Sequence, residues 1–509
     1  ALYGEALEIC RRLGRAVEVA TTAQNRANLY LAQYEAGVAG AAEAAHVLHG
    51  EALEIFRRLG REGEVATTAQ NRANLYSAQY EAGVAGAAEA AHALYGEALE
   101  IRRRLGRWLD WVTTSRNRLG LLEAEGRDPE VVAAVLDLLR AVRQRIGDIP
   151  DRVSRNRLLT EIDGVGQRGA AAGLRSGDVA MAVRCLEEGR AQQLGARLRE
   201  QEAQLSPQDR AALDAARQAL GAAEAEADQA RKQASDVQAA FEAATDPDAR
   251  AQIEPIRRAA TEARDAAEAQ VAQAHQSLGQ LKARIGLEDV TVPVPEVTAL
   301  RAALGPATLA QAVPGKDGGW LLLLAPDREA WETIAVPGLT QGAVTGVTNR
   351  YLAALTQFEE AVVRPIEGWP VNDFSKALEA EHLAAIRTLI TGPLHQALAD
   401  AGQPPANGAN LAPEVVLCLP AELSMLPLAA TRDAQTGRPL YEDYALRFVP
   451  SLGALVSAAG RARRPVSATA LTVLDPLGDL DMPVHPAEGL FAPEGLTELR
   501  GDREDPMRA

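Results

Sequence analysis

The chain has 509 residues, room for about three domains, and a net charge of −16 at pH 7. This acidity argues against a nucleic-acid backbone or an anionic membrane surface as its main partner. No apolar run reaches the roughly 18 residues of a membrane-spanning helix, and three distant cysteines without metal-ligand spacing favour a reducing, cytoplasmic location with no bound metal or cofactor.

The first part of the chain repeats with a period of 46 residues. Residues 1–46 and 47–92 differ at only six positions, and a third copy starts at Ala93. A period of roughly 20–50 residues with helical patterning is typical of a stacked array, in which each unit buries its apolar face against its neighbours. Such arrays hold partners, so any chemistry is expected further along the chain.

Each repeat unit is predicted to contain two helices. In the first unit, apolar residues at three- and four-residue spacing predict a helix over 19–36, and a second helix over 39–59 ends at Gly60. The segment 18–30, followed by an Ala-rich stretch and Gly50-Glu-Ala-Leu-Glu-Ile55, resembles tetratricopeptide repeats of the kinesin-light-chain type. The resemblance covers residues 1–145 and implies an α-helical solenoid with an extended unit.

The third unit departs from the other two at a pair of tryptophans. Trp108 and Trp111 stand where the second unit has Glu62 and Val65. The pair could form a platform for an aromatic ligand, or it could cap the array by burying its end against the next helices. We favour the cap.

Two helical regions follow the repeats. Residues 146–204 predict further helix pairs and include Gly164-Val-Gly166-Gln-Arg-Gly169, which fits the dinucleotide fingerprint; that mechanism needs flanking strands, and none is predicted nearby. Residues 205–288 predict a long helical hairpin of coiled-coil character with a solvated charged face. Its first helix begins at Ser206, a favourable N-cap, and its turn falls at 246–248.

The composition changes from residue 291, where prolines mark a linker. Strands alternating with helices indicate an α/β domain over 296–509. The segment 314–319 looks briefly like a phosphate loop, but Lys316 is followed by Asp317, and a hairpin turn explains it better. The predicted strands are 308–313, 320–324, 331–336, 415–419, 445–449 and 468–474, with helices over 341–363 and 374–401.

The cysteines are not predicted to be nucleophiles. Cys10 aligns with Phe56 and Arg102 in the other copies, which indicates a structural position. Cys185 lies in a predicted helix, and Cys418 lies inside an apolar strand, where a thiol is buried and inert. None of the seven histidines forms an obvious pair with a cysteine, so no catalytic residue is assigned.

Several segments of the α/β region nevertheless follow one another in a specific order, and Leu186-Glu-Glu-Gly-Arg-Ala-Gln-Gln-Leu194 precedes them. The segments are Glu414-Val-Val-Leu-Cys-Leu-Pro420, Leu423-Ser-Met-Leu-Pro427, Tyr441–Phe448, Val449-Pro450-Ser451-Leu452 and Leu474-Asp-Pro-Leu-Gly478. Their order resembles the CHAT family, caspase-like domains usually found behind tetratricopeptide repeats.

The resemblance implies a cysteine-peptidase fold in which a His and a later Cys form the dyad, the imidazole activating the thiolate. The family's His-Gly and Ser-Ala-Cys motifs are not in this sequence, and neither His485 nor Cys418 takes their place. We therefore expect the first, non-catalytic half of a caspase-like domain, and no peptidase activity. Both ends of the sequence look cut, and the stretch after Leu474 is expected to be poorly ordered and clipped first by proteases.

Two functions of different classes fit this sequence. The first is a repeat-regulated caspase-like cysteine peptidase, represented by its protein-binding repeats and half of its catalytic domain. The second is a protein-binding scaffold whose caspase-like domain is inactive; a repeat adaptor with an unrelated α/β domain is a third. A His-Gly and Ser-Ala-Cys pair in the DNA after Ala509 would favour the peptidase.

A protein or peptide partner is expected in the repeat groove. If the family alignment holds, one helix face carries polar side chains that both donate and accept, and stacked amides of this kind can clamp a peptide backbone. The same amides could merely solvate or cap the helices. The residues are Thr21, Gln24, Asn25, Asn28, Asn71, Asn74 and Asn117.

Overall fold

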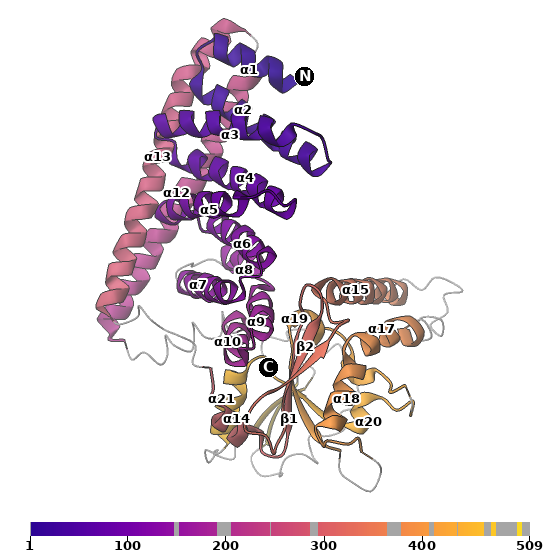
Figure 1. Cartoon of the computed structure of the whole chain (residues 1–509). Helices are drawn as coiled ribbons and strands as arrows, with labels where there is room; N and C mark the ends of the chain where they lie inside the picture. The colour runs from indigo at the N-terminus through magenta and orange to yellow at the C-terminus, as the bar shows by residue number, and fades with distance from the viewer. Residues whose placement is uncertain are drawn as a thin grey trace. The chain divides into compact units, whose positions relative to one another are not determined.

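The computed structural model describes residues 2–146, 152–190, 205–244, 246–285, 294–363, 378–406, 412–434, 436–462, 470–474 and 496–500. The chain divides into two units, Ala1–Gly453 and Ala454–Ala509. The first unit is mostly helical and ends in a small mixed sheet of five strands (Figure 1). Among the described residues, no helix is both long and apolar enough to cross a membrane.

The repeats form seven helices, in which each helix packs on its neighbours in sequence. Alanines on the facing sides are fully buried, so the helix backbones approach closely. The helices end at glycines such as Gly60, whose φ of +67° is readily adopted only without a side chain. They are α1 (Leu2–Arg12), α2 (Ala16–Glu35), α3 (Ala41–Arg58), α4 (Glu62–Glu81), α5 (Ala87–Arg104), α6 (Trp108–Ala124) and α7 (Asp128–Ile146).

Contacts between the units recur at the sequence period. An arginine near the end of one second helix pairs with a glutamate of the following second helix, and a histidine bonds to the last turn of the next first helix. Because the same pairs form one period apart, successive units pack with the same geometry. The contacts are Arg11–Glu51 at 2.5 Å and Arg57–Glu97 at 2.7 Å, then His46–Gln79 at 2.7 Å and His92–Glu125 at 2.5 Å.

The packing continues into α8 (Arg152–Glu161), α9 (Val165–Arg175) and α10 (Val179–Arg190), although the sequence repeat is lost. Ion pairs join these helices to α6 and α7 across a spacing of 45 residues, close to the period of the repeats. The predicted further helix pairs are thus present within 152–190. The pairs are Arg116–Glu161, Glu123–Arg168 and Arg143–Glu188.

The glycines of the dinucleotide-like motif serve helix packing. Gly166 and Gly169 lie in α9, against α10. A Cβ at Gly166 would lie 2.7 Å from the carbonyl oxygen of Cys185, and one at Gly169 would lie 2.8 Å from the Cys185 Sγ. The motif is therefore a close contact between two helices and has no flanking strand.

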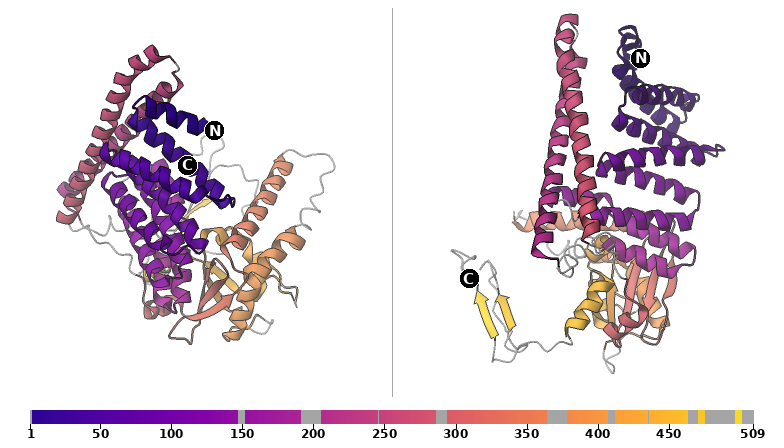
Figure 2. Two further views of the ribbon diagram at one scale, coloured as in Figure 1. Left: turned by 45° about the horizontal axis from the view of Figure 1, so that its top comes forward. Right: turned by 90° about the vertical axis from the view of Figure 1, so that its left-hand side faces the viewer.

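The predicted hairpin is formed by α12 (Pro207–Ala243) and α13 (Pro247–Arg284), which lie beside the repeats (Figure 2). Ser206 caps α12, since its hydroxyl accepts a hydrogen bond of 3.0 Å from the amide of Asp209. The buried residues between the two helices are spaced in sevens, as in a coiled coil. They include Leu213, Leu220, Ala227, Val271 and Leu278.

The hairpin contacts the repeats in step with their period. Glu18 and Glu64 occupy the same position in the first two units, and they pair with Arg257 and Arg264 of α13 at 3.8 and 2.7 Å. The two arginines are one heptad apart, a rise of about 10 Å along the helix. One heptad of the hairpin therefore spans one repeat unit.

The sheet has the strand order β3-β2-β1-β4-β5. β2 runs antiparallel to β1 and β3, whereas β4 runs parallel to β1 and β5. The strands are β1 (Thr308–Val313), β2 (Gly319–Leu324), β3 (Glu332–Val336), β4 (Glu414–Cys418) and β5 (Ala445–Phe448). The intervening helices are α14 (Val297–Leu304), α15 (Gln341–Val363), α17 (Ala384–Ile386), α18 (Gly392–Asp400), α19 (Ala421–Ser424) and α20 (Leu440–Asp443).

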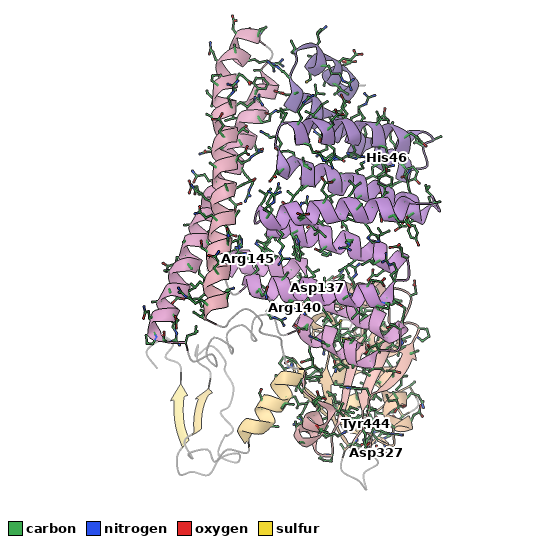
Figure 3. The ribbon with its side chains drawn as sticks, turned by 60° about the vertical axis from the view of Figure 1, so that its left-hand side comes forward. His46, Asp137, Arg140, Arg145, Asp327 and Tyr444 are labelled. Atoms are coloured by element: carbon green, nitrogen blue, oxygen red, sulfur yellow. The ribbon has the colours of Figure 1, made fainter. Side chains whose placement is uncertain are left out.

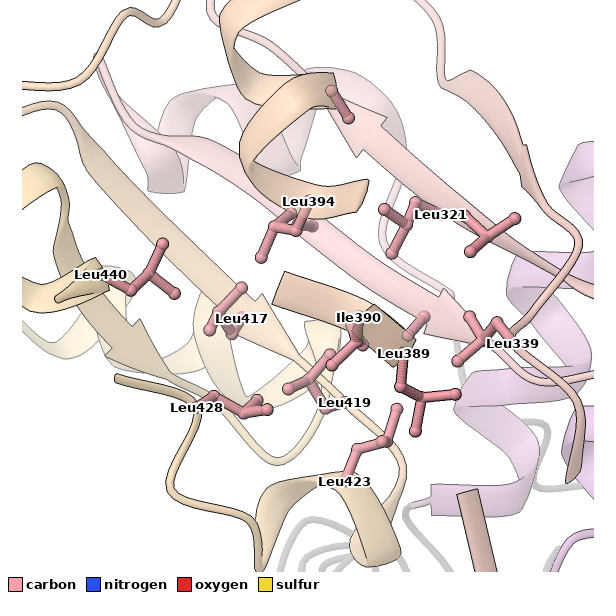
Figure 4. Packing of buried hydrophobic residues seen from close by; sticks show 14 of the residues in the cluster. Leu321, Leu339, Leu389, Ile390, Leu394, Leu417, Leu419, Leu423, Leu428 and Leu440 are labelled. Carbon is pink, nitrogen blue, oxygen red and sulfur yellow. The ribbon is translucent and has the colours of Figure 1, made fainter. Parts of the chain in front are cut away.

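Each face of the sheet is buried differently. On one face Leu321 and Leu417 pack against Leu389, Ile390 and Leu394, which belong to the helical segment before β4 (Figure 4). That segment contains π-helical turns. The other face carries Gln311 and Cys418, both fully buried, and β1 contacts α9. The sheet is thus a layer between its own helices and the end of the repeat stack.

The second unit contains two described strands, β6 (Ala470–Leu474) and β7 (Leu496–Arg500), which pair in parallel, and most of α21 (Leu452–Ala462). The sequence predicts β6 but not β7. The expectation of poor order covers all residues after Leu474. Of these, 496–500 form the strand β7, and 475–495 and 501–509 lie outside the described residues.

Candidate functional site

The predicted binding face lies on the first helices of the units. Asn25 is exposed, and Asn28, Asn71, Asn74 and Asn117 are half-buried. Thr21 and Gln24 line a cavity of 310 Å³ that α12 and α13 close on the other side. These two residues therefore face the chain's own hairpin.

Part of this face forms a ladder of hydrogen bonds between units. The Thr68 hydroxyl donates to Gln24 Oε1 at 2.5 Å, and Thr114, one period later, donates to Gln70 Oε1 at 2.9 Å. The Asn117 amide likewise donates to Asn74 Oδ1 at 3.2 Å. The structure thus brings Asn74 and Asn117 together, as stacked amides require.

Asn25 and Asn71 differ from the other amides. They occupy the same position in the first two units, and neither makes a side-chain hydrogen bond with the described residues. Their donors and acceptors are free for a partner. The amides that remain available for binding are therefore these two, with the unused donor and acceptor capacity of Asn117.

Two buried polar groups near this face lack partners. Tyr95 donates a hydrogen bond of 2.8 Å to Asn74 Oδ1. One period earlier the corresponding residues are His49 and Asn28, and both ring nitrogens of His49 and the Asn28 Oδ1 are buried with no hydrogen-bond partner among the described residues. Burial and the nearby Arg72 lower the pKa of His49 from 6.5 to about 4, so the ring is neutral at pH 7.

A second candidate site joins the repeats to the sheet at Arg190, the last residue of α10. Its guanidinium donates to Gln311 Oε1 at 2.6 Å, and to the carbonyl oxygen and Sγ of Cys418 at 2.8 and 3.1 Å. Gln311 and Cys418 are paired residues of the parallel strands β1 and β4. Arg190 therefore fixes two neighbouring strands from a helix of the stack.

The three residues before Arg190 each contact a different element. Glu187 accepts hydrogen bonds of 2.9 and 3.3 Å from the amides of Leu452 and Gly453, the last two residues of the first unit. Glu188 is ion-paired with Arg143 of α7, and Gly189 lies against the backbone of Gly166 in α9. We call residues 187–190 the junction segment.

The junction segment was assigned no role from the sequence. Its only signal there is the resemblance of residues 186–194 to the segment that precedes the caspase-like domain. Burial raises the pKa of Glu187, with the charge of Arg190 acting in the opposite direction. A buried carboxylate and guanidinium at the meeting point of four elements form a rigid connection rather than a reaction centre.

The thiols have the chemistry expected of structural cysteines. Burial raises the pKa of Cys185 to about 12 and that of Cys418 to about 11, and burial also raises the pKa of the half-buried Cys10. At neutral pH all three are protonated and weakly nucleophilic. Within the part of the chain that the structure describes, no histidine bonds to a cysteine, and no group of His, Cys, Asp and Glu has the arrangement of a metal site.

The two tryptophans of the third unit have separate surroundings. Trp108 donates a hydrogen bond of 2.9 Å from its indole nitrogen to His275 of α13, and its ring packs on the His275 ring. Trp111 lies edge-on to Trp108 and lines a cavity between α5, α6 and α7. Trp108 therefore helps to hold the hairpin, while Trp111 remains at an open surface.

The sequence was compared with known protein families and with curated proteins. No family model matches the chain, and no curated protein matches it.

Proposed function

We propose that residues 1–145 form a tetratricopeptide-like solenoid that binds a protein or peptide, and that the sheet is the first half of a caspase-like domain of the CHAT type. The chain is then the sensing part of a repeat-regulated cysteine peptidase. The recurrence of the same ion pairs and hydrogen bonds at the 46-residue period supports the solenoid. The mixed sheet with parallel β1, β4 and β5 is compatible with a caspase-like core.

The junction segment is the observation that carries the proposal. Regulation requires that a change in the array be transmitted to the sheet, and transmission needs an element that both regions hold rigidly. Residues 187–190 contact α7, α9, two strands of the sheet and the Leu452–Gly453 backbone within four consecutive positions. A shift of α10 therefore displaces β1 and β4 together.

Hydrogen exchange tests this coupling. A peptide selected from a random library on the immobilised chain should change the exchange of β1 and β4 amides when it binds. The Arg190→Ala variant should bind the peptide with unchanged affinity and leave the exchange of both strands unaltered by binding. A full exchange response in Arg190→Ala would contradict transmission through the junction.

The amide face is tested by removing Asn71, which makes no side-chain hydrogen bond with the described residues, and Asn117, which keeps unused donor and acceptor capacity. An Asn71→Ala, Asn117→Ala double variant should bind the selected peptide at least about tenfold more weakly, because two backbone-clamping amides are lost. Tyr95→Phe is the matched control, since it removes a hydrogen bond to Asn74 without touching a free amide. Full affinity in the double variant would exclude this face as the peptide site.

The alternative function is a protein-binding scaffold with an inactive caspase-like domain. The raised pKa values of Cys10, Cys185 and Cys418 fit both functions, because neither function assigns the nucleophile to one of these three thiols. Under both functions the purified chain should not cleave a peptide library. Cleavage that Cys418→Ala abolishes would contradict both, and peptidase activity in the product of the natural gene would favour the regulated enzyme.

A further inference from the structure

A cavity of about 920 Å³ lies between α5, α6 and α7, on the third repeat unit. Trp111, Leu119 and Leu122 form part of its wall, and Arg103 and Arg118 project into it. Figure 3 labels Asp137 and Arg140, which line it from α7, and Arg145, which pairs with Glu224 of the hairpin instead. The composition of the wall differs from that of the first two units in three ways.

First, Arg103 has lost its carboxylate. The equivalent arginine of the second unit, Arg57, pairs with Glu97 at 2.7 Å. One period later, the position of Glu97 is occupied by Arg143, which is buried and paired with Glu188. Arg103 is exposed, and its side chain has no ion pair or hydrogen bond with the described residues.

Second, Arg118 has lost its aromatic ring. Its equivalent Arg72 lies over the ring of Tyr76, 5.7 Å from the centroid, and Arg26 lies over Tyr30 in the same way at 5.5 Å. In the third unit the tyrosine is replaced by Leu122. The Nε atoms of Arg72 and Arg118 are both buried with no hydrogen-bond partner among the described residues, so the missing ring is what distinguishes Arg118.

Third, small apolar residues are replaced by large ones. Trp111 stands in place of Val65, and Leu119 stands in place of Ala73. The same unit therefore presents the exposed Arg103 and the half-buried Arg118, neither with a counterion among the described residues, beside an apolar wall containing an indole. This combination is typical of a protein-binding surface, where aromatic and arginine side chains are enriched.

We propose that this cavity, the third-unit cavity, binds an acidic peptide segment in which an apolar side chain lies between carboxylates. The carboxylates would pair with Arg103 and Arg118, and the apolar side chain would contact the half-buried ring of Trp111. This inference rests on the proposed protein-binding function and names the class of partner.

Charge complementarity supports an acidic occupant. Two acidic side chains of the wall are paired with arginines of the wall, Glu130 with Arg127 and Asp137 with Arg140. The remaining acidic residue of the wall, Glu100, is exposed. The chain as a whole carries a charge of −16, so an acidic peptide is repelled by most of its surface. Binding of such a peptide would therefore report a local site and not general attraction.

The test uses a fluorescein-labelled Gly-Glu-Glu-Leu-Glu-Glu-Gly peptide and its Gln-for-Glu counterpart, measured by fluorescence anisotropy. The acidic peptide should bind, and its affinity should fall between about 50 and about 300 mM salt, because exposed ion pairs are screened. An Arg103→Ala, Arg118→Ala double variant should bind about tenfold more weakly. Arg57→Ala, Arg72→Ala, the same change one period earlier, is the matched control and should bind normally.

Three results with the peptides would overturn the inference. They are equal binding of the Gln peptide, an equal loss in the control variant, and unchanged binding in the Arg103→Ala, Arg118→Ala protein. Tighter binding of a single-stranded oligonucleotide at the same arginines would also overturn it. Arg103→Ala alone is a second variant, and because Arg103 is exposed this change should leave folding intact. The peptide should also quench the fluorescence of Trp111, and the absence of this quenching in Trp111→Phe would locate the contact.

The two proposals fail separately. If Asn71→Ala, Asn117→Ala abolishes binding of the acidic peptide while the Arg103→Ala, Arg118→Ala protein retains it, the third-unit cavity is not the site, and the amide face is. If instead the library-selected peptide binds the Asn71→Ala, Asn117→Ala variant with full affinity and binding of the acidic peptide requires the two arginines, the amide face is excluded. The third-unit cavity is then retained as the peptide site.

Discussion

The second and third repeat units have the same helices and differ in what their side chains bind. In the second unit Arg57 pairs with Glu97, and Arg72 lies over the ring of Tyr76. In the third, their equivalents Arg103 and Arg118 face an open cavity. The comparison teaches that the alanine core preserves the stacking, because the packed backbones leave surface contacts free to change.

The largest effect is expected at the repeat position that is Glu97 in one copy and Arg143 in the next, because the ion pairs of these two residues differ strongly in burial. Arg143 and Glu188 are 4% and 3% exposed, whereas Arg57 is 52% exposed. Arg143→Met leaves a buried carboxylate without its main partner and should lower the free energy of unfolding by about 3–5 kcal/mol. Urea denaturation followed by circular dichroism measures it.

The matched change on the surface is Arg57→Met, which breaks the exposed pair with Glu97 and should lower the free energy of unfolding by less than about 1 kcal/mol. Comparable losses in Arg57→Met and Arg143→Met would show that the two pairs do not differ as their burial indicates.

The next effect concerns His49, which stands where the third unit has Tyr95. Because burial lowers the pKa of His49 from 6.5 to about 4, the unfolded chain binds a proton more readily than the folded one between these values. The free energy of unfolding is therefore not reduced by His49 above about pH 6.5, and it falls as the pH decreases, by about 3 kcal/mol near pH 4. Thermal melts at pH 7 and pH 4.5 measure this.

His49→Tyr supplies the control for that pH dependence. The tyrosine hydroxyl would reach Asn28 as Tyr95 reaches Asn74, which satisfies a buried oxygen. The variant should melt higher at pH 7 and lose less stability at pH 4.5 than the wild type. An unchanged pH dependence would mean that His49 is not the group responsible.

A smaller effect than that of His49 is expected at the hydrogen bond between Tyr95 and Asn74. Tyr95→Phe should cost about 1 kcal/mol of unfolding free energy, the usual net value of one neutral hydrogen bond, with some addition for the unsatisfied Asn74 oxygen. A double-mutant cycle with Asn117→Ala, which removes the other donor to Asn74, should show coupling between the two changes. Additive losses would show that the two donors act independently.

The helices and strands were largely predictable because their signals are local. Ser206 marks the start of α12, and the helix predicted over 341–363 matches α15 residue for residue. Apolar runs likewise placed β1 and β4 within one residue of their observed bounds. The limits of each element depend on caps and turns that neighbouring residues encode.

The contacts that carry the functional argument were not predictable, because their partners are far apart in sequence. Arg190 and Cys418 are separated by 228 residues, and Glu187 and Leu452 by 265. Nothing near Gln24 indicates that the hairpin covers it. By contrast, the loss of the partners of Arg103 and Arg118 could be predicted from the sequence. Aligning the copies shows Arg143 and Leu122 at the positions of the partners Glu97 and Tyr76.

Because one heptad of α13 spans one repeat unit, the length of the hairpin corresponds to the number of units that it contacts. A unit can be duplicated or deleted without loss of stacking, as the near-identity of residues 1–46 and 47–92 illustrates. The ion pairs of Glu18 and Glu64 with Arg257 and Arg264 stay in register only if α12 and α13 each change by seven residues. The number of repeats and the length of the hairpin are therefore bound to evolve, and to be engineered, together.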